Sequence, residues 1–361
     1  METFRRLSRS NKPSIAVGDI HTLVVTRDGE LCVCGSNKNG QLGLEGIVSA
    51  DVLTPVPFAE VVVVVAAGST STFVITETGN LYACGLNERR GSFGFDLDNS
   101  ALQPTLKQVP LAEAVKTVAI GYNHALVVTM SGALYACGGN EHGRLGLVDR
   151  HDRRVFTRVP LSEAVKAVSA GYGHTLVLAE SGALYACGFN QVGELGLGDK
   201  RTREKLMRVP LSEKVTTIAA GSGHSLVGTE SGILYTCGSN AYGELALGDK
   251  QLRLTLTQAP FDEAVEAVSS NSNSTLVITS RGELYACGYN TFGALGFGDR
   301  VTRDTLTAVK ITEPVAIAAT SYRHTVILTA DGKLYACGDN RFGFLGTGDR
   351  IGRSKMTEIF L

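Results

Sequence analysis

Residues 183–199 read Ala-Leu-Tyr-Ala-Cys-Gly-Phe-Asn-Gln-Val-Gly-Glu-Leu-Gly-Leu-Gly-Asp, and versions of this stretch occur seven times along the chain. The cysteine before the first glycine falls at Cys34, Cys84, Cys137, Cys187, Cys237, Cys287 and Cys337. These positions are 50, 53, 50, 50, 50 and 50 residues apart, and an asparagine follows three positions later each time. A fixed period of this length indicates a repeat protein in which each copy is one supersecondary unit.

One copy predicts four short strands. In the fourth copy, a first strand over 164–170 leads through Gly-Tyr-Gly-His into an apolar run over 175–179, which is typical of a strand covered on both faces. Ser181-Gly182 then predicts a two-residue hairpin turn into the Leu-Tyr-Ala-Cys-Gly strand, because glycine supplies the positive φ of such turns. A long glycine-rich loop follows. A fourth strand, such as 156–159 in the preceding copy, then turns through Pro-Leu-Ser-Glu into the next copy.

These copies predict an all-β fold, a seven-bladed β-propeller of four-stranded antiparallel blades. The propeller is expected to occupy residues 14–361 as one domain, after a short basic tail over residues 1–13. Helix periodicity is absent from the sequence. An open superhelical stack is the alternative, but it would need distinct polar caps, which the terminal copies lack.

The two ends of the chain suggest how the ring closes. The chain starts with a first strand at 14–17 that has no fourth strand before it, and it finishes with a fourth strand at 355–361. If the Pro-Leu-Ser-Glu turn joins strands of one blade, these two segments complete each other. We therefore expect 355–361 to pair with 14–17 and leave no open edge.

Composition narrows the classes of function. The 34 Lys and Arg nearly balance the 35 Asp and Glu, so bulk charge predicts no general affinity for nucleic acid or anionic membranes, although local patches remain possible. No apolar run is long enough to span a bilayer, and we expect a soluble intracellular protein without membrane insertion. The 8 cysteines are expected to be buried and reduced, with no C-x-x-C zinc motif.

The repeat Gly-x-x-His, apolar strand, Gly-x-Leu-Tyr-x-x-Gly-x-Asn-x-x-Gly-x-Leu-Gly-x-Gly-Asp resembles that of the regulator of chromosome condensation family over residues 14–361. The resemblance implies a seven-bladed propeller. One departure is systematic, because cysteine replaces the tryptophan that the family usually has before the glycine, and the chain has no Trp. Kelch propellers have a similar period, but their double-glycine and tryptophan signature is missing.

The resemblance implies several binding functions. Founding members are guanine nucleotide exchange factors for a Ran-type GTPase that insert a hairpin wedge, and they dock on nucleosomes with a basic tail. The three extra residues between Cys84 and Cys137 are too few for an obvious wedge. A related plant ultraviolet-B receptor senses light through tryptophans, which this chain lacks, and other relatives inhibit β-lactamases or serve as interaction platforms. The tail residues that could touch DNA or an acidic partner are Arg5, Arg6, Arg9 and Lys12.

The recurring polar residues do not predict catalysis. Histidines at 21, 124, 174, 224 and 324 would be spread one per blade around a ring, too far apart to share a metal ion. We expect each to bond a neighbouring backbone group, and the repeat asparagines to satisfy amides of their own loops. No catalytic constellation or phosphate-binding loop is present, so neither enzyme activity nor a metal, cofactor or small-molecule substrate is expected.

Asp and Arg recur four residues apart in the long loops of copies three to seven, whereas copies one and two offer the acids at 45, 51, 96 and 98. Each pair could brace its own loop. The arginines could also form a basic arc on one face that orients a protein partner. The partner-binding candidates are Arg153, Arg203, Arg253, Arg303 and Arg353, with Phe189, Tyr289 and Phe344 as aromatic anchors if exposed, or else as packing between blades.

The sequence thus predicts a monomeric, non-enzymatic interaction scaffold that binds a protein through one propeller face. An exchange factor for a Ran-type small GTPase with chromatin or nucleosome association is the alternative. An inhibitor or lectin-like binder is a third, weaker class.

Overall fold

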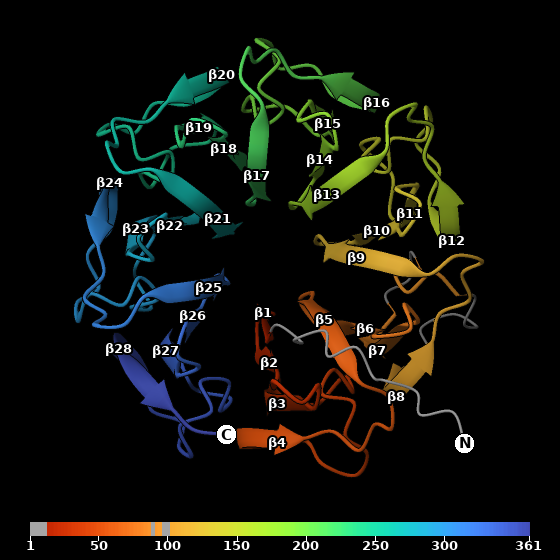
Figure 1. Ribbon diagram of the computed structural model, residues 1–361, viewed down its shortest axis with the longest axis vertical. Helices are drawn as coiled ribbons and strands as arrows, with labels where there is room; N and C mark the ends of the chain where they lie inside the picture. The colour runs from red at the N-terminus through yellow and green to blue at the C-terminus, as the bar shows by residue number, and fades with distance from the viewer. Residues whose placement is uncertain (1–12, 88–90, 96–101) are drawn as a thin grey trace, which may run out of the picture.

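The computed structural model describes residues 13–87, 91–95 and 102–361. These residues form seven four-stranded antiparallel sheets arranged as blades around a central axis (Figure 1). In every blade the four strands follow one another in sequence, the first strand lies nearest the axis and the fourth lies outermost. The prediction of a seven-bladed propeller is confirmed.

The strand bounds repeat from blade to blade. Blades 1 to 3 contain β1 Ser14–Val17, β2 His21–Val25, β3 Leu31–Ser36 and β4 Ser49–Pro55; β5 Val62–Ala67, β6 Ser71–Thr76, β7 Leu81–Leu86 and β8 Leu102–Gln108; β9 Val115–Ile120, β10 His124–Thr129, β11 Leu134–Gly138 and β12 Arg153–Arg158. Blades 4 and 5 contain β13 Val165–Ala170, β14 His174–Ala179, β15 Leu184–Gly188 and β16 Arg203–Arg208; β17 Val215–Ala220, β18 His224–Thr229, β19 Leu234–Gly238 and β20 Arg253–Gln258. Blades 6 and 7 contain β21 Val265–Asn271, β22 Ser274–Thr279, β23 Leu284–Gly288 and β24 Arg303–Ala308; β25 Val315–Thr320, β26 His324–Thr329, β27 Leu334–Gly338 and β28 Arg353–Ile359.

The local sequence explains each strand and turn. The apolar second strand β14 is buried at all six residues, because neighbouring blades cover both of its faces. Gly182 has φ +85° in the two-residue turn that joins β14 to β15, as the hairpin prediction required. Gly188 has φ +105°, and a Cβ there would lie 2.4 Å from the carbonyl oxygen of Gly173, so only glycine fits.

The predicted closure of the ring by strand pairing is wrong. β1 pairs with β2, and β28 pairs with β27 through Leu334 and Ile359, so the first and last blades are each complete. The reason lies in the Pro-Leu-Ser-Glu connection, which joins the outermost strand of one blade to the innermost strand of the next and leaves no strand missing.

Side chains and one short backbone bridge close the ring instead. Ile15 and Val17 of blade 1 share a buried apolar cluster with Val326 and Leu328 of blade 7. An isolated β-bridge joins Val52 of β4 to Thr347 in the last long loop. Arg350 of the same loop pairs with Asp51 at 3.1 Å. The same loop-to-outer-strand bridge recurs between other blades, at Leu147↔Lys205, Leu197↔Thr255 and Phe297↔Lys355.

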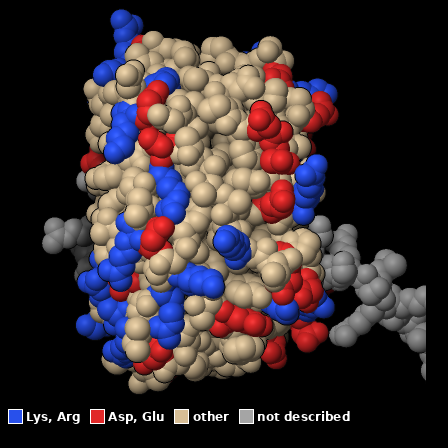
Figure 2. Space-filling view, turned by 90° about the vertical axis from the view of Figure 1, so that its left-hand side faces the viewer, with Lys and Arg blue, Asp and Glu red and all other residues tan. Residues whose placement is uncertain are grey.

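The antiparallel strand order gives the ring two different faces. The turn after the first strand and the long loop after the third strand of each blade lie on one side, called here the loop face. The two-residue turns and the connections between blades lie on the opposite side, called here the hairpin face. When the ring is viewed edge-on, Lys and Arg are more frequent along one of these faces, and Asp and Glu are more frequent along the other (Figure 2).

Candidate binding surface

The Asp and Arg that recur on the loop face bind each other within their own loops. Arg203 donates from one guanidinium nitrogen to Asp199 Oδ2 at 2.6 Å and from the other to the carbonyl oxygen of Arg201 at 2.6 Å. Asp199 Oδ1 also accepts the Arg201 amide at 2.9 Å, and these bonds lower the pKa of its carboxyl group. The same pairs form at Arg153–Asp149, Arg253–Asp249, Arg303–Asp299 and Arg353–Asp349.

These pairs brace the loops, which is the first of the two roles that their spacing allowed. The five arginine side chains are only 20–27 % exposed, so the charge that they offer a partner is small. More accessible positive charge comes from the residue after each Asp. Lys200, Lys250 and Arg300 are exposed and form no ion pair with any described residue, whereas Arg150 and Arg350 bind acids of the next blade.

The hairpin face carries a glutamate at the same position of each connection between blades. Glu163, for example, accepts hydrogen bonds from the hydroxyl groups of Ser181 and Tyr185, which lower the pKa of its carboxyl group. Tyr82 donates in the same way to Glu60, and this bond raises the pKa of Tyr82 to about 12. The equivalent acids elsewhere are Glu113, Glu213, Glu263 and Glu313.

The three aromatic candidates have different environments. Phe344 is fully buried and packs against His324 with ring centroids 4.4 Å apart, so its assignment as a surface anchor is wrong. It follows the second glycine of its loop, and this position faces the interior between blades. Phe189 and Tyr289 are partly exposed, and Phe189 contacts His142 at a centroid distance of 4.9 Å.

Tyr289 belongs to a larger group of rings on the loop face, called here the aromatic arc. Tyr322 stacks on Tyr289 at 5.3 Å with an interplanar angle of 8°, and Tyr242 meets Tyr289 edge-on at 5.0 Å. Tyr122 and Tyr172 stack at 4.4 Å in adjacent blades. The arc, which the sequence analysis missed except at Tyr289, consists of Tyr122, Tyr172, Tyr242, Tyr289, Phe292 and Tyr322.

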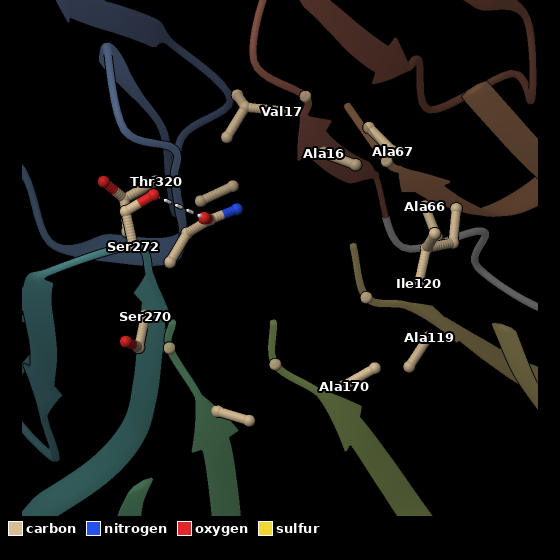
Figure 3. Close-up of a pocket in the computed structure, with 18 of the residues that line it drawn as sticks. Ala16, Val17, Ala66, Ala67, Ala119, Ile120, Ala170, Ser270, Ser272 and Thr320 are labelled. Carbon is tan, nitrogen blue, oxygen red and sulfur yellow. Dashed lines mark hydrogen bonds between the residues drawn. The ribbon is translucent and has the colours of Figure 1, made fainter. Parts of the chain in front are cut away.

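The axis of the ring is a channel with a volume of about 520 Å³. Small side chains from the first strands point into it, including Ala66, Ala119, Ala170 and Ser270 (Figure 3). Tyr122, Tyr172 and Tyr322 lie at its loop-face mouth, where the equivalent residue of blade 1 is Asp19. The Asp19 carboxylate accepts a hydrogen bond of 2.6 Å from the Ser69 hydroxyl group. The channel is therefore lined by a mixture of small apolar and polar side chains, and three of the seven equivalent positions at its loop-face mouth carry tyrosine.

The recurring histidines join neighbouring blades. His174 Nε2 lies 3.1 Å from Ser225 Oγ of the next blade, and this hydroxyl donates to the carbonyl oxygen of Glu194 at 2.6 Å. Cys237 Sγ donates to the same oxygen at 3.6 Å. We call this arrangement a histidine latch. The other complete examples in the described chain are His21–Thr72–Gln41, His124–Thr175–Arg144, His224–Thr275–Glu244 and His324–Thr22–Phe344.

The latch determines the chemistry of the imidazole. The single hydroxyl proton is given to the carbonyl oxygen, so the imidazole donates from Nε2, and in the neutral ring the lone pair lies on Nδ1. Burial lowers the pKa of both His21 and His174 to about 4, which agrees with a neutral ring. The expected histidine partner was a backbone group, and the hydroxyl group of the next blade corrects that expectation. Nδ1 of His174 is buried out of reach of solvent, so its lone pair is not accessible to a substrate and the latch is structural.

The cysteines and asparagines have the expected structural roles. All eight cysteines are buried, and burial raises the pKa of the Cys187 thiol. Asn190 Oδ1 accepts the Leu195 amide at 3.0 Å, and its amide group donates to the Asp199 carbonyl oxygen at 2.9 Å. Among the described residues, no group of three or more His, Cys, Asp or Glu is placed to hold a metal ion. No helix in that part of the chain is long and apolar enough to cross a bilayer.

Some candidates lie outside the described residues. They are Arg5, Arg6, Arg9 and Lys12 of the basic tail, and Asp96 and Asp98 of the second loop. Asp51, an acid of the first copy, pairs with Arg350 as part of the ring closure.

Comparison with known proteins agrees with this geometry. Residues 3–314 match the model of the RCC1-like domain, and residues 315–343 match that of the regulator of chromosome condensation (RCC1) repeat. The chain belongs to the RCC1-like family.

Two RCC1-like relatives illustrate how diverse the family is. The chain is 31% identical over 144 residues to the ultraviolet-B receptor UVR8 of Arabidopsis thaliana, covering 39% of this chain and 32% of the receptor. It is 32% identical over 142 residues to the X-linked retinitis pigmentosa GTPase regulator of Mus musculus, covering 39% of this chain and 9% of that protein. The matches thus span a third or less of these relatives.

Solved structures of similar shape establish the fold. Human WBSCR16 superposes with a TM-score of 0.83 at 20% identity, covering 92% of this chain and 95% of WBSCR16. Prp20p of Saccharomyces cerevisiae, described with its binding to Gsp1p and histones, superposes with a TM-score of 0.75 at 24% identity, covering 84% of this chain and 79% of Prp20p. RCC1-like propellers therefore share this architecture at low sequence identity.

Proposed function

We propose that this RCC1-like propeller is a non-enzymatic, monomeric, intracellular scaffold that binds a protein partner through the rim of its loop face. The unequal charge of the two faces carries the proposal (Figure 2). On the loop-face rim, Lys200, Lys250 and Arg300 present positive charge that no described acid neutralises. Complementary potentials orient a partner and speed its association more than they raise its affinity.

Apolar side chains beside these cations provide contact area. Val301 is 61% exposed and Ile351 is 66% exposed, and both lie at the tips of long loops next to Arg300 and Arg350. Exposed aliphatic groups surrounded by charge are typical of a protein interface. The braced Asp–Arg pairs beneath them hold the tips in place, so the rim is preorganised and loses little conformational entropy when a partner binds.

The test reverses the charge of the rim without breaking the braces. The triple variant Lys200→Glu, Lys250→Glu, Arg300→Glu is compared with Lys166→Glu, Lys214→Glu, Lys310→Glu. The second variant makes the same change of charge at exposed residues on the hairpin side, in blade 4 and in the connections that follow blades 4 and 6. Proteins captured from cells by the wild-type chain are purified, and their association rates are measured. The rim variant should slow association by about tenfold or more, and the control by less than twofold. Equal rates for the two variants would contradict the proposal.

A second candidate is guanine nucleotide exchange, with association with nucleosomes. The similarity to Prp20p, described with Gsp1p and histones, favours it. Purified Ran-type GTPase loaded with fluorescent GDP is the probe. If catalytic amounts of the chain accelerate GDP release and the rim variant does not, the rim is an exchange surface rather than a scaffold.

A further inference from the structure

The aromatic arc is an exposed feature of the loop face that the proposed function does not use. Its rings come from five consecutive blades, blades 3 to 7. Tyr122, Tyr172 and Tyr322 line the channel mouth, and the other three rings lie on the long loops of blades 5 and 6. Tyr172 is 53% exposed, Tyr122 48%, Tyr242 39% and Tyr322 36%. A tyrosine that is this exposed contributes much less packing energy than a buried one does. The stability of the propeller therefore does not account for these side chains.

The arc presents flat ring faces rather than a closed hydrophobic pocket. Stacking of Tyr122 on Tyr172 and of Tyr289 on Tyr322 aligns the rings in pairs, so each pair acts as one rigid platform. The Tyr322 hydroxyl also donates to the Tyr289 hydroxyl at 3.3 Å, which fixes the second pair further. Rigid aromatic platforms bind other planar groups with little loss of conformational entropy.

Positive charge lies outward from the rings. The tyrosines at 122, 172 and 322 follow the innermost strands, whereas Lys200, Lys250 and Arg300 lie at the tips of long loops that precede the outermost strands. Arg341 is 57% exposed between these two zones and shares Asp339 with Arg323. From the axis outward, the loop face therefore presents planar rings and then cations.

We propose that this surface binds single-stranded nucleic acid, with bases stacked on the aromatic arc and phosphates directed toward the outer cations. Stacking platforms beside a basic track are the two elements by which proteins hold single strands without reading sequence. A duplex already stacks its bases on one another and would leave the rings uncovered. An acidic peptide would satisfy the cations but would not use several flat rings in succession.

The rest of the mouth limits where the strand can lie. Blades 1 and 2 have Asp19 and Ser69 where blades 3 and 4 have Tyr122 and Tyr172, and the Asp19 carboxylate repels phosphate. Blades 5 and 6 have Ser222 and Ser272 at this position, and their rings lie on the long loops instead. The strand therefore follows the rings of blades 3 to 7 and avoids Asp19. This inference goes beyond the proposed protein-binding role and does not depend on it.

The test uses the full chain and a fluorescein-labelled oligouridine of about 20 nucleotides, followed by fluorescence anisotropy at several salt concentrations. The wild-type chain should bind, and Tyr172→Ala should weaken binding by about tenfold, because one stacked base is lost. Tyr172→Phe keeps the ring and should bind as the wild type does. The variant Lys200→Glu, Lys250→Glu should bind more weakly and with a smaller salt dependence.

Controls separate this inference from simpler explanations. Met130→Ala changes an exposed apolar residue away from the arc, on the hairpin side of blade 3, and should leave binding unchanged. Circular dichroism and thermal melting check that each variant is folded. The inference is overturned if the wild type does not bind at low salt, or if Tyr172→Ala binds as well as the wild type. It is also overturned if duplex RNA or polyglutamate competes as well as the unlabelled single strand does.

Discussion

The seam between blades 4 and 5 and the seam between blades 2 and 3 use equivalent positions but are held together differently. The first has the latch of His174, Ser225 and Glu194. In the second, Ser71 replaces the histidine and Ala125 replaces the hydroxyl residue, so only the bond from Cys137 Sγ to the Ser92 carbonyl oxygen remains, at 3.3 Å.

A third residue also fills space where the imidazole is missing. A Cβ added at Gly171 would lie 2.5 Å from Cε1 of His174, whereas one added at the equivalent Gly68 would lie 2.5 Å from Oγ of Ser71 and 3.0 Å from Cγ2 of Ile120. The isoleucine methyl group of blade 3 thus lies close to the glycine that, at the latched seams, is contacted by the imidazole. Some seams of the propeller are therefore held by a polar latch and this one by apolar packing. The stability of the two kinds of seam should respond differently to mutation and to pH.

The largest difference is expected from removing the two equivalent side chains. His174→Ala should lower the free energy of unfolding by about 3 kcal/mol, because it leaves a cavity and a buried hydroxyl with one bond fewer. Ser71→Ala should lower it by less than about 0.5 kcal/mol. Urea denaturation followed by circular dichroism measures both. Similar losses for the two variants would show that the latch adds nothing to the seam.

Acid should weaken the latched seams selectively. The pKa of His174 is about 4 in the folded chain and about 6.5 when unfolded, so between these values the unfolded chain binds the extra proton. Stability is then full above pH 6.5 and falls as the pH drops toward 4, by about 1.4 kcal/mol per pH unit for each such histidine. Denaturation of the wild type and His174→Gln between pH 7 and 5 measures this slope.

The stability of His174→Gln should depend less steeply on pH than that of the wild type, because one fewer proton is taken up on unfolding. The carboxyl pKa values of Asp299 and Asp349 are lowered to about 2, so the stability that these groups contribute is lost only as the pH falls below about 4. That range lies outside this window. Identical slopes for the two chains would mean that His174 titrates normally when folded.

The smallest effect is expected from converting one seam into the other. Ile120→Ala alone should lower the free energy of unfolding by about 2 kcal/mol. Adding Ser71→His and Ala125→Thr should recover most of this loss, because the three changes rebuild the latch, and the triple variant should lie within about 1 kcal/mol of the wild type. The same denaturation experiment applies. A triple variant less stable than Ile120→Ala would show that blade 3 has lost the geometry of the latch.

The repeat made most of the fold predictable, because glycine turns and apolar strands recur at fixed positions. Ring closure was mispredicted because a Pro-Leu-Ser-Glu turn can join two strands of one blade or two adjacent blades, and its sequence is the same in both cases. The latch had a visible signal. A hydroxyl residue follows each histidine position except at Ala125, and the preceding copy has Ser71 in place of histidine.

The candidate site was less predictable than the fold. Asp–Arg pairs four residues apart were foreseen, since their spacing lets both side chains meet within one loop. The burial of Phe344 was not, because equivalent positions include Gln41, Arg144 and Glu194, a mixture that shows no hydrophobic pattern. What these residues share is a backbone carbonyl oxygen that accepts the latch bond, and side-chain identity does not report on that.

Consecutive construction of the blades has a consequence for the order of folding. The latch between His124 and Thr175 joins residues 51 apart, whereas the one between His324 and Thr22 joins residues 302 apart. Short-range contacts form first because less chain entropy is lost in bringing them together. A newly made chain should therefore assemble as a growing open coil of blades, and its two ends should meet in the final step.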